Sequence, residues 1–241
     1  VVNAKSLAGL IHSGDVIPAT GITGLKITEN IKLNVANEIV LSSGTEYAIN
    51  LGEYANATIE SATLGGEKVT FVNGKLTVSD EFRANTQNHG YQTLSVTVLK
   101  NGKYYNITAN VLVVTKDIST IDELTAATTA GADNVVYGYY RLTQNVGSSG
   151  AWINVENKGD WKNADGSIGF RGTLDGNGFA VDGNFATHGL FGIIGNGAVV
   201  KNITFNVYYY QNGRQTLARS ITGATIEDVT INIKSIYGTL D

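Results

Sequence analysis

Apolar and polar residues alternate through much of the first half of the chain, as they do in strands that bury one face. In the run 93–98 the even positions are apolar and the odd positions polar, so the apolar side chains share one face. Asn73-Gly74 and Asn101-Gly102 separate paired runs, and Asn-Gly favours a two-residue hairpin because both residues tolerate positive φ. The expected strands are 24–28, 31–41, 46–51, 57–64, 68–72, 75–79, 92–99 and 103–114.

This number and spacing of short strands is typical of an antiparallel β-sandwich. We therefore expect residues 1–116 to form an immunoglobulin-like sandwich. Tyr91 precedes the run 92–99 and is either the corner tyrosine of such a sandwich or an ordinary surface residue.

The hydrophobic period changes after residue 117. Thr120 and Glu123 have the spacing of a capping box, in which a hydroxyl and a carboxylate bond the free N–H groups of a helix start. Apolar residues then recur at a spacing of three, at Ile121, Leu124 and Ala127, and give the segment one apolar stripe. A short helix is expected here.

A loose internal repeat occupies the last part of the chain. Val181, Val200 and Ile226 begin comparable apolar segments and lie 19 and 26 residues apart. Such a period, with one short strand in each repeat, is typical of a β-solenoid, whose coils bury their edges by stacking on one another. Residues 117–241 are therefore expected to form stacked coils behind the short helix.

The alignment of these repeats also predicts two surface columns. Asp182, Lys201 and Glu227 would follow one another as a ladder of alternating charge. Asp228 would stack on Asn202 and Gly183 at a turn.

The same region resembles a known family. Its segments GTLDGNGFAV (172–181), GLFG (189–192) and GAVVKNI (197–203) are similar to the GLUG-type repeats of bacterial cell-surface proteins. Those proteins resemble right-handed parallel β-helices of the pectin-lyase-like class. The resemblance implies an all-β chain, in which the immunoglobulin-like domain 1–116 leads through a cap helix into a β-helix at 117–241. The GLFG motif occurs once, so the β-helix is expected to be short or truncated at Asp241.

Composition narrows the function classes. Only 16% of the residues are charged and the net charge is −4, so nucleic acid is not an expected partner. The chain has no Cys, which excludes disulfides, thiolate metal sites and a Cys nucleophile. Its lack of Met and its start at Val1 indicate a piece cut from a longer exported chain. No apolar run is long enough to cross a membrane.

Two carboxylates are candidates for catalytic chemistry. Enzymes of the pectin-lyase-like class cleave polysaccharides with clustered carboxylates, and hydrolysis needs two of them about 5 to 9.5 Å apart. Asp182 and Asp228 are the candidates for such a pair. Asp175 is expected to bond its own turn amides instead. No cofactor or metal is expected, because the segment 175–177 starts like a calcium loop but lacks its later ligands.

Aromatic residues offer a more plausible ligand surface, because sugar rings stack on aromatic faces while nearby amides bond their hydroxyls. The candidate ligand-binding residues are Trp152, Trp161, Tyr208 and Tyr210. We therefore expect a monomeric, non-enzymatic adhesion module of an extracellular bacterial surface protein, anchored outside this sequence, whose partner is a glycan or a host matrix protein. The alternatives are a polysaccharide lyase or glycosidase of the pectin-lyase-like class and a structural spacer.

Overall fold

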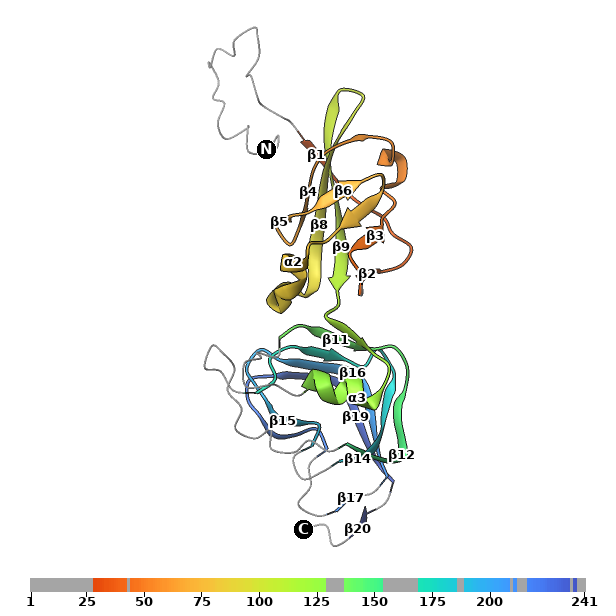
Figure 1. Cartoon of the computed structure of the whole chain (residues 1–241), viewed down its shortest axis with the longest axis vertical. Coiled ribbons are helices and arrows are strands. Elements are labelled where there is room, and N and C mark those ends of the chain that lie inside the picture. Colours follow the sequence, from red (N-terminus) through yellow and green to blue (C-terminus); the bar gives the residue numbers. More distant parts are fainter. Residues whose placement is uncertain are drawn as a thin grey trace. The chain divides into compact units, whose positions relative to one another are not determined.

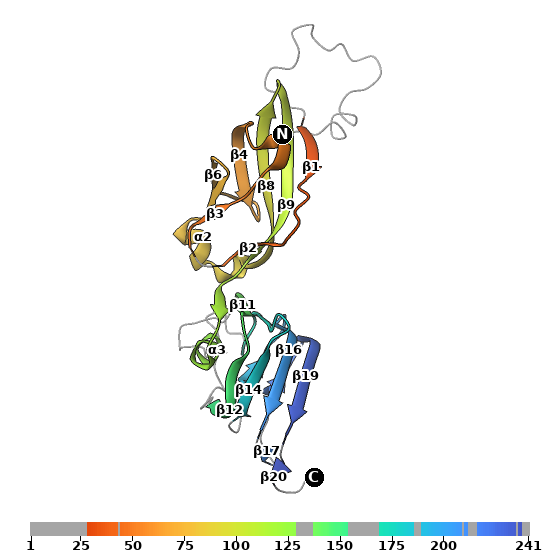
Figure 2. The ribbon, with the colours of Figure 1, turned by 90° about the vertical axis from the view of Figure 1, so that its right-hand side faces the viewer.

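The computed structural model describes residues 28–42, 44–128, 137–153, 169–185, 189–208, 210–211, 216–234 and 236–237. Contacts within the chain divide it into two compact units (Figures 1 and 2). The first unit comprises residues 1–84 and 91–112, and the second comprises 85–90 and 113–241. The described residues are mostly in strands, so the all-β class is confirmed.

The first unit contains two sheets. The larger sheet has the order β1-β9-β8-β4-β5, with β2 also paired to β9, and the smaller has the order β3-β7-β6. Strand β1 runs parallel to β9, whereas β4 pairs antiparallel with both β5 and β8. The strands are β1 (Thr28–Lys32), β2 (Ile39–Leu41), β3 (Glu46–Ala48), β4 (Thr58–Leu64), β5 (Glu67–Lys68), β6 (Thr70–Val72), β7 (Lys75–Thr77), β8 (Gly90–Lys100) and β9 (Lys103–Val113). Short helical turns are η1 (Gly52–Tyr54), α2 (Asp80–Ala84) and η2 (Thr86–Asn88), of which η2 belongs to the second unit.

Local sequence signals of the first unit are confirmed. Asn73 and Asn101 both have φ near 51°, each is followed by a positive-φ glycine, and they link β6 to β7 and β8 to β9. The alternate apolar positions of β8, such as Val96, are buried. The expected strand 31–41 is broken by an irregular stretch between β1 and β2. Tyr91 is an exposed surface residue whose hydroxyl donates to Glu38 Oε1 at 2.7 Å.

The second unit is a stack of parallel strands. Its main sheet has the order β10-β11-β13-β16-β14-β12, with β19 paired to β16, and two short sheets pair β15 with β18 and β17 with β20. All of these pairs are parallel. The strands are β10 (Lys116–Ile118), β11 (Tyr139–Leu142), β12 (Val146–Ile153), β13 (Thr173–Asp175), β14 (Ala180–Phe185), β15 (Phe191–Ile194), β16 (Val199–Val207), β17 (Tyr210–Gln211), β18 (Ala218–Ile221), β19 (Thr225–Ile233) and β20 (Ile236–Tyr237).

The strands of one coil pair with strands at matching places in the next coil. The first part of β16 pairs with β13 and its later part with β14, and β19 repeats this path one coil further. We call β10, β11, β13 and residues 199–201 and 225–227 the first wall. We call β12, β14 and residues 204–207 and 229–233 the second wall. Their inward side chains form one core, which includes Phe170 and Phe191 with ring centroids 4.8 Å apart.

The expected helix is α3 (Ile121–Thr128), and it packs against β10 and β12 (Figure 1). Its apolar stripe faces the core, with Leu124 fully buried. The Thr120 hydroxyl accepts a hydrogen bond from the Glu123 N–H at 3.2 Å, as the capping box predicts. The Glu123 carboxylate accepts the N–H of Ser119 at 2.8 Å, whereas the capping box would use the N–H of Thr120, one residue later.

The alignment of the repeats was wrong in one coil. Val200 and Ile226 do pair, but Leu174 occupies the preceding place in that column and Val181 pairs with Phe205. The reason is that this coil contains two separate strands, β13 and β14, and the alignment took the second of them for the first. The bend between the two walls recurs at fixed positions, since Asn202 and Asp228 each lie between the same two pairs of β16 and β19 and both have φ near 50°.

The GLFG motif has a structural role. Gly189 has φ +74°, and Leu190 and Phe191 are fully buried in the core. The motif therefore turns the chain and then places two large side chains inward at the start of β15.

Candidate ligand-binding face

An alternating charge ladder follows the outer side of the first wall. Parallel pairing places Asp117, Arg141, Asp175, Lys201 and Glu227 in one column. The predicted ladder is therefore present, but the prediction that Asp182 belongs to it was wrong. Asp175 takes that place because it lies one coil before Lys201 at the same point on the wall.

Asp175 is surrounded by donors. Its Oδ1 accepts the N–H of Asn177 at 2.9 Å, which is the predicted turn, and the side-chain amide of Asn202 at 3.2 Å. Its Oδ2 accepts the Tyr139 hydroxyl and lies 3.4 Å from Lys201 Nζ. Burial alone would raise the pKa of Asp175, but these hydrogen bonds and the lysine charge outweigh it and lower that pKa. This carboxylate is engaged in holding the coils together.

A second column lies on the outer side of the second wall. Asn232 donates its side-chain amide to Asn206 Oδ1 at 3.0 Å, and Asn206 donates to Asp182 Oδ1 at 3.0 Å. The Tyr208 hydroxyl also donates to Asp182 Oδ1, at 3.1 Å. These residues alternate with Val181, Phe205 and Val207, which are buried in the core, so they face outward.

The two columns differ in charge. Asp182 is bonded by an amide and a phenol, and no cation in the described ranges forms an ion pair with it. Its Oδ2 also accepts no hydrogen bond from the residues that the structure describes. The hydrogen bond and the negative charge of Asp182 together raise the pKa of Tyr208. The second wall thus presents an anionic acceptor that no cation of the described residues pairs with.

Trp152 borders this column. It pairs with Asn184 on β14, and its side chain is 53% exposed. Asn184 is buried and donates to Ser149 O at 3.2 Å, while its Oδ1 accepts no hydrogen bond from any described residue. A buried amide oxygen without a donor is uncommon in proteins and marks a place for a water or a ligand hydroxyl. We call Trp152, Asp182, Asn184, Asn206, Tyr208 and Asn232 the outer face.

The structure brings together only some of the predicted residues. Trp152 and Tyr208 lie on the same wall, one on each side of β14. Tyr210 belongs to β17 and its side chain is outside the described part, as is the whole of Trp161. Asn206 and Asn232 were not predicted, although the repeated pattern Thr-apolar-Asn-apolar at 204–207 and 230–233 could have identified them.

The candidate catalytic pair does not assemble. Asp182 lies two strands from Asn232, and Asp228 lies four residues before Asn232 on the same strand. With about 4.8 Å between strands and about 3.3 Å per residue, the two Cα atoms are about 16 Å apart. This exceeds the separation at which two carboxylates share a glycosidic bond. Asp228 instead forms the bend between the walls.

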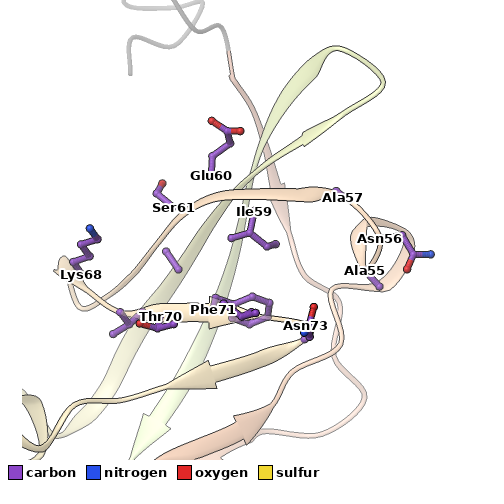
Figure 3. A pocket seen from close by; sticks show the side chains of 14 residues that line it. Ala55, Asn56, Ala57, Ile59, Glu60, Ser61, Lys68, Thr70, Phe71 and Asn73 are labelled. Atoms are coloured by element: carbon purple, nitrogen blue, oxygen red, sulfur yellow. The ribbon is translucent and has the colours of Figure 1, made fainter.

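The first unit contains a separate groove of about 640 Å³ between β4 and β6. Figure 3 shows Ile59 and Phe71 between these strands, with Glu60 and Ser61 pointing away from them. Asn56 lies at one end of the groove. The volume suits a small ligand. Its lining includes one carboxylate and one ammonium group, so it offers hydrogen bonds but no carboxylate pair for glycosidic hydrolysis.

Other site types find no support in the described residues. No cluster of three or more His, Cys, Asp or Glu side chains there could hold a metal ion. None of the described helices has the length and apolar character needed to span a bilayer. In comparisons with known proteins, no family model, curated protein or solved structure matches this chain.

Proposed function

We propose that this chain is a non-enzymatic adhesion module of a bacterial cell-surface protein and that it binds a glycan on the outer face. One observation carries the proposal: an exposed Trp152 stands beside a column of amides and a carboxylate that pairs with no cation among the described residues. Indole rings stack on the C–H faces of sugars, and carboxylate and amide groups bond their hydroxyls. A flat, repeating column of this kind suits an extended polysaccharide chain.

The architecture supports the family assignment within this proposal. The orders β3-β7-β6 and β9-β8-β4 correspond to strands B-E-D and G-F-C of an immunoglobulin-like sandwich. The parallel stack supports a β-helix, and we propose a right-handed one because parallel crossover connections are right-handed in nearly all proteins. The resemblance to GLUG-type surface proteins also supports a location outside the cell within this proposal.

The test is a glycan array followed by titration calorimetry with the full chain. We expect binding to an oligosaccharide, and we expect Trp152→Ala to weaken it about tenfold, the effect of removing an aromatic anchor. Asp182→Asn keeps the shape of the side chain and is expected to weaken binding severalfold. Tyr91→Ala is the matched control, because it removes an exposed aromatic residue from the first unit.

Two results would overturn the proposal. Folded wild-type protein that binds neither the array nor host matrix proteins would contradict adhesion as the function. Binding that survives in Trp152→Ala but is lost in Asn56→Ala would place the ligand in the groove of Figure 3 instead.

A further inference from the structure

The strand β19 ends the described stack with its apolar side uncovered. Ile226, Ile231 and Ile233 are 39%, 44% and 43% exposed. Their partners one coil earlier are Val200, Phe205 and Val207, which are 0 to 1% exposed. Ile221, at the end of the neighbouring sheet, is also exposed. Half of the large hydrophobic side chains that are exposed in the described residues therefore gather at this end.

The backbone at this edge is also unpaired. Within the described residues β19 pairs with β16 and with no strand on its other side. The N–H of Lys234 points to β16, where it bonds Val207 O at 2.8 Å. Because backbone groups alternate in direction along a strand, Val229, Ile231 and Ile233 point their N–H and C=O groups to the open edge.

We propose that β19 pairs antiparallel with β19 of a second copy of this chain, with the two-fold axis at Ile231. This register sets Val229 opposite Ile233, so that the residues with free backbone groups bond one another and their apolar side chains meet. It also sets Asp228 opposite Lys234, which gives two pairs of opposite charge in the dimer. A register shifted by two residues in either direction would separate Asp228 from Lys234 in both charge pairs. It would also shorten the paired segment.

The other end of the stack is not an alternative partner. The helix α3 packs on β10 and β12 there, so that end is covered. A head-to-tail stack that continued the charge column would also set Glu227 of one copy against Asp117 of the next, and like charges in such positions repel. The two-fold contact is self-complementary and closes after two copies. This inference goes beyond the proposed function and does not depend on it.

Sedimentation velocity of the full chain, over a range of concentrations up to about 100 µM, tests the proposal. We expect wild type to form a dimer in reversible equilibrium and Ile231→Arg to be monomeric, because two arginines would meet on the axis. Val72→Arg is the matched control, since Val72 is 55% exposed in the first unit, and it should leave the equilibrium unchanged.

Charge variants test the register itself. Lys234→Glu faces Asp228 of the partner with a like charge and should weaken the dimer about tenfold. Adding Asp228→Asn removes that repulsion, suits the positive φ of the position, and should restore most of the loss. Lys68→Glu is the control for the change in net charge. A monomeric wild type, larger open-ended assemblies, or no recovery in the double variant would each overturn the proposal.

Discussion

Asp175 offers the sharpest test of how the coils are held together. Replacing it with Ala leaves the Tyr139 hydroxyl, the Asn177 N–H and the Asn202 amide without their acceptor. It also removes the ion pair between Asp175 and Lys201, whose side chain is 21% exposed. The variant keeps the backbone of β13 and changes only this centre.

The expected cost is about 4 kcal/mol, of which the hydrogen bonds supply the larger part and the ion pair the remainder. Each of the three hydrogen bonds contributes about 1 kcal/mol. Breaking a fully buried ion pair costs about 3 to 5 kcal/mol, but Lys201 reaches some solvent and recovers part of its hydration. Asp117→Ala is the matched control from the same column. Its carboxylate is 30% exposed and accepts two bonds from Arg141, so its loss should cost no more than about 1 kcal/mol.

Tryptophan fluorescence during urea unfolding is a selective assay. The chain has two tryptophans, Trp152 and Trp161, and both belong to the second unit. Equal losses of unfolding free energy in the two variants, or a loss below about 1 kcal/mol for Asp175→Ala, would refute this reasoning. They would show that burial does not decide how much each residue of the charge column contributes to stability. Because the pKa of Asp175 is lowered from 3.8, its contribution should be complete above pH 3.8 and disappear as the pH falls through the folded-state value.

Further predictions concern the cap helix and a bend. Hydrogen bonds from Ser119 and Lys116 lower the pKa of Glu123 to about 2 from 4.5, so its stabilisation should be complete above pH 4.5 and be lost as the pH falls to about 2. Thermal midpoints of wild type and Glu123→Gln should therefore differ at pH 6 and converge near pH 2. Gly176→Ala would press a methyl group into the carbonyl of Asn202 and should cost about 2 kcal/mol in urea unfolding. Gly150→Ala should cost under about 0.5 kcal/mol, because no atom of the described residues would lie within 4 Å of the new methyl group.

The features predicted correctly from the sequence depend on neighbouring residues. The hairpin at Asn73, the turn at Asp175 and the helix cap at Thr120 each need only a few adjacent positions to specify a backbone shape. Short-range hydrogen bonds and allowed φ values decide these structures. Tertiary context therefore left them unchanged.

The register between coils depends on the number of residues that connect one strand to its partner in the next coil. The sequence pattern does not reveal where those connections begin and end. Asp175 and Lys201 are 26 residues apart, whereas Arg141 and Asp175 are 34 apart, because the intervening excursions differ in length. The alignment of Asp182 with Lys201 failed for this reason. Asn184 of the outer face was not predicted, because its role in the site depends on its burial beside β12. No local sequence pattern predicts that burial.

The outer face and the open edge meet on strand β19, which links the two proposals. Asn232, the last member of the amide column, is on β19. In the two-fold pairing it lies opposite Thr230 of the second copy, and paired residues of adjacent strands face the same side of a sheet. The outer faces of the two copies would then form one continuous surface, so a long polysaccharide could contact both.

Such a surface predicts a dependence of affinity on ligand length. Once one copy holds a long chain, the second binds it at a high effective concentration, and affinity should rise about a hundredfold or more over that of a short oligosaccharide. Ile231→Arg should abolish this gain and leave affinity for the short oligosaccharide unchanged, because residue 231 faces the core and not the ligand. Calorimetry with the two ligand lengths measures both effects. Equal gains in wild type and Ile231→Arg would separate the two surfaces and refute their cooperation.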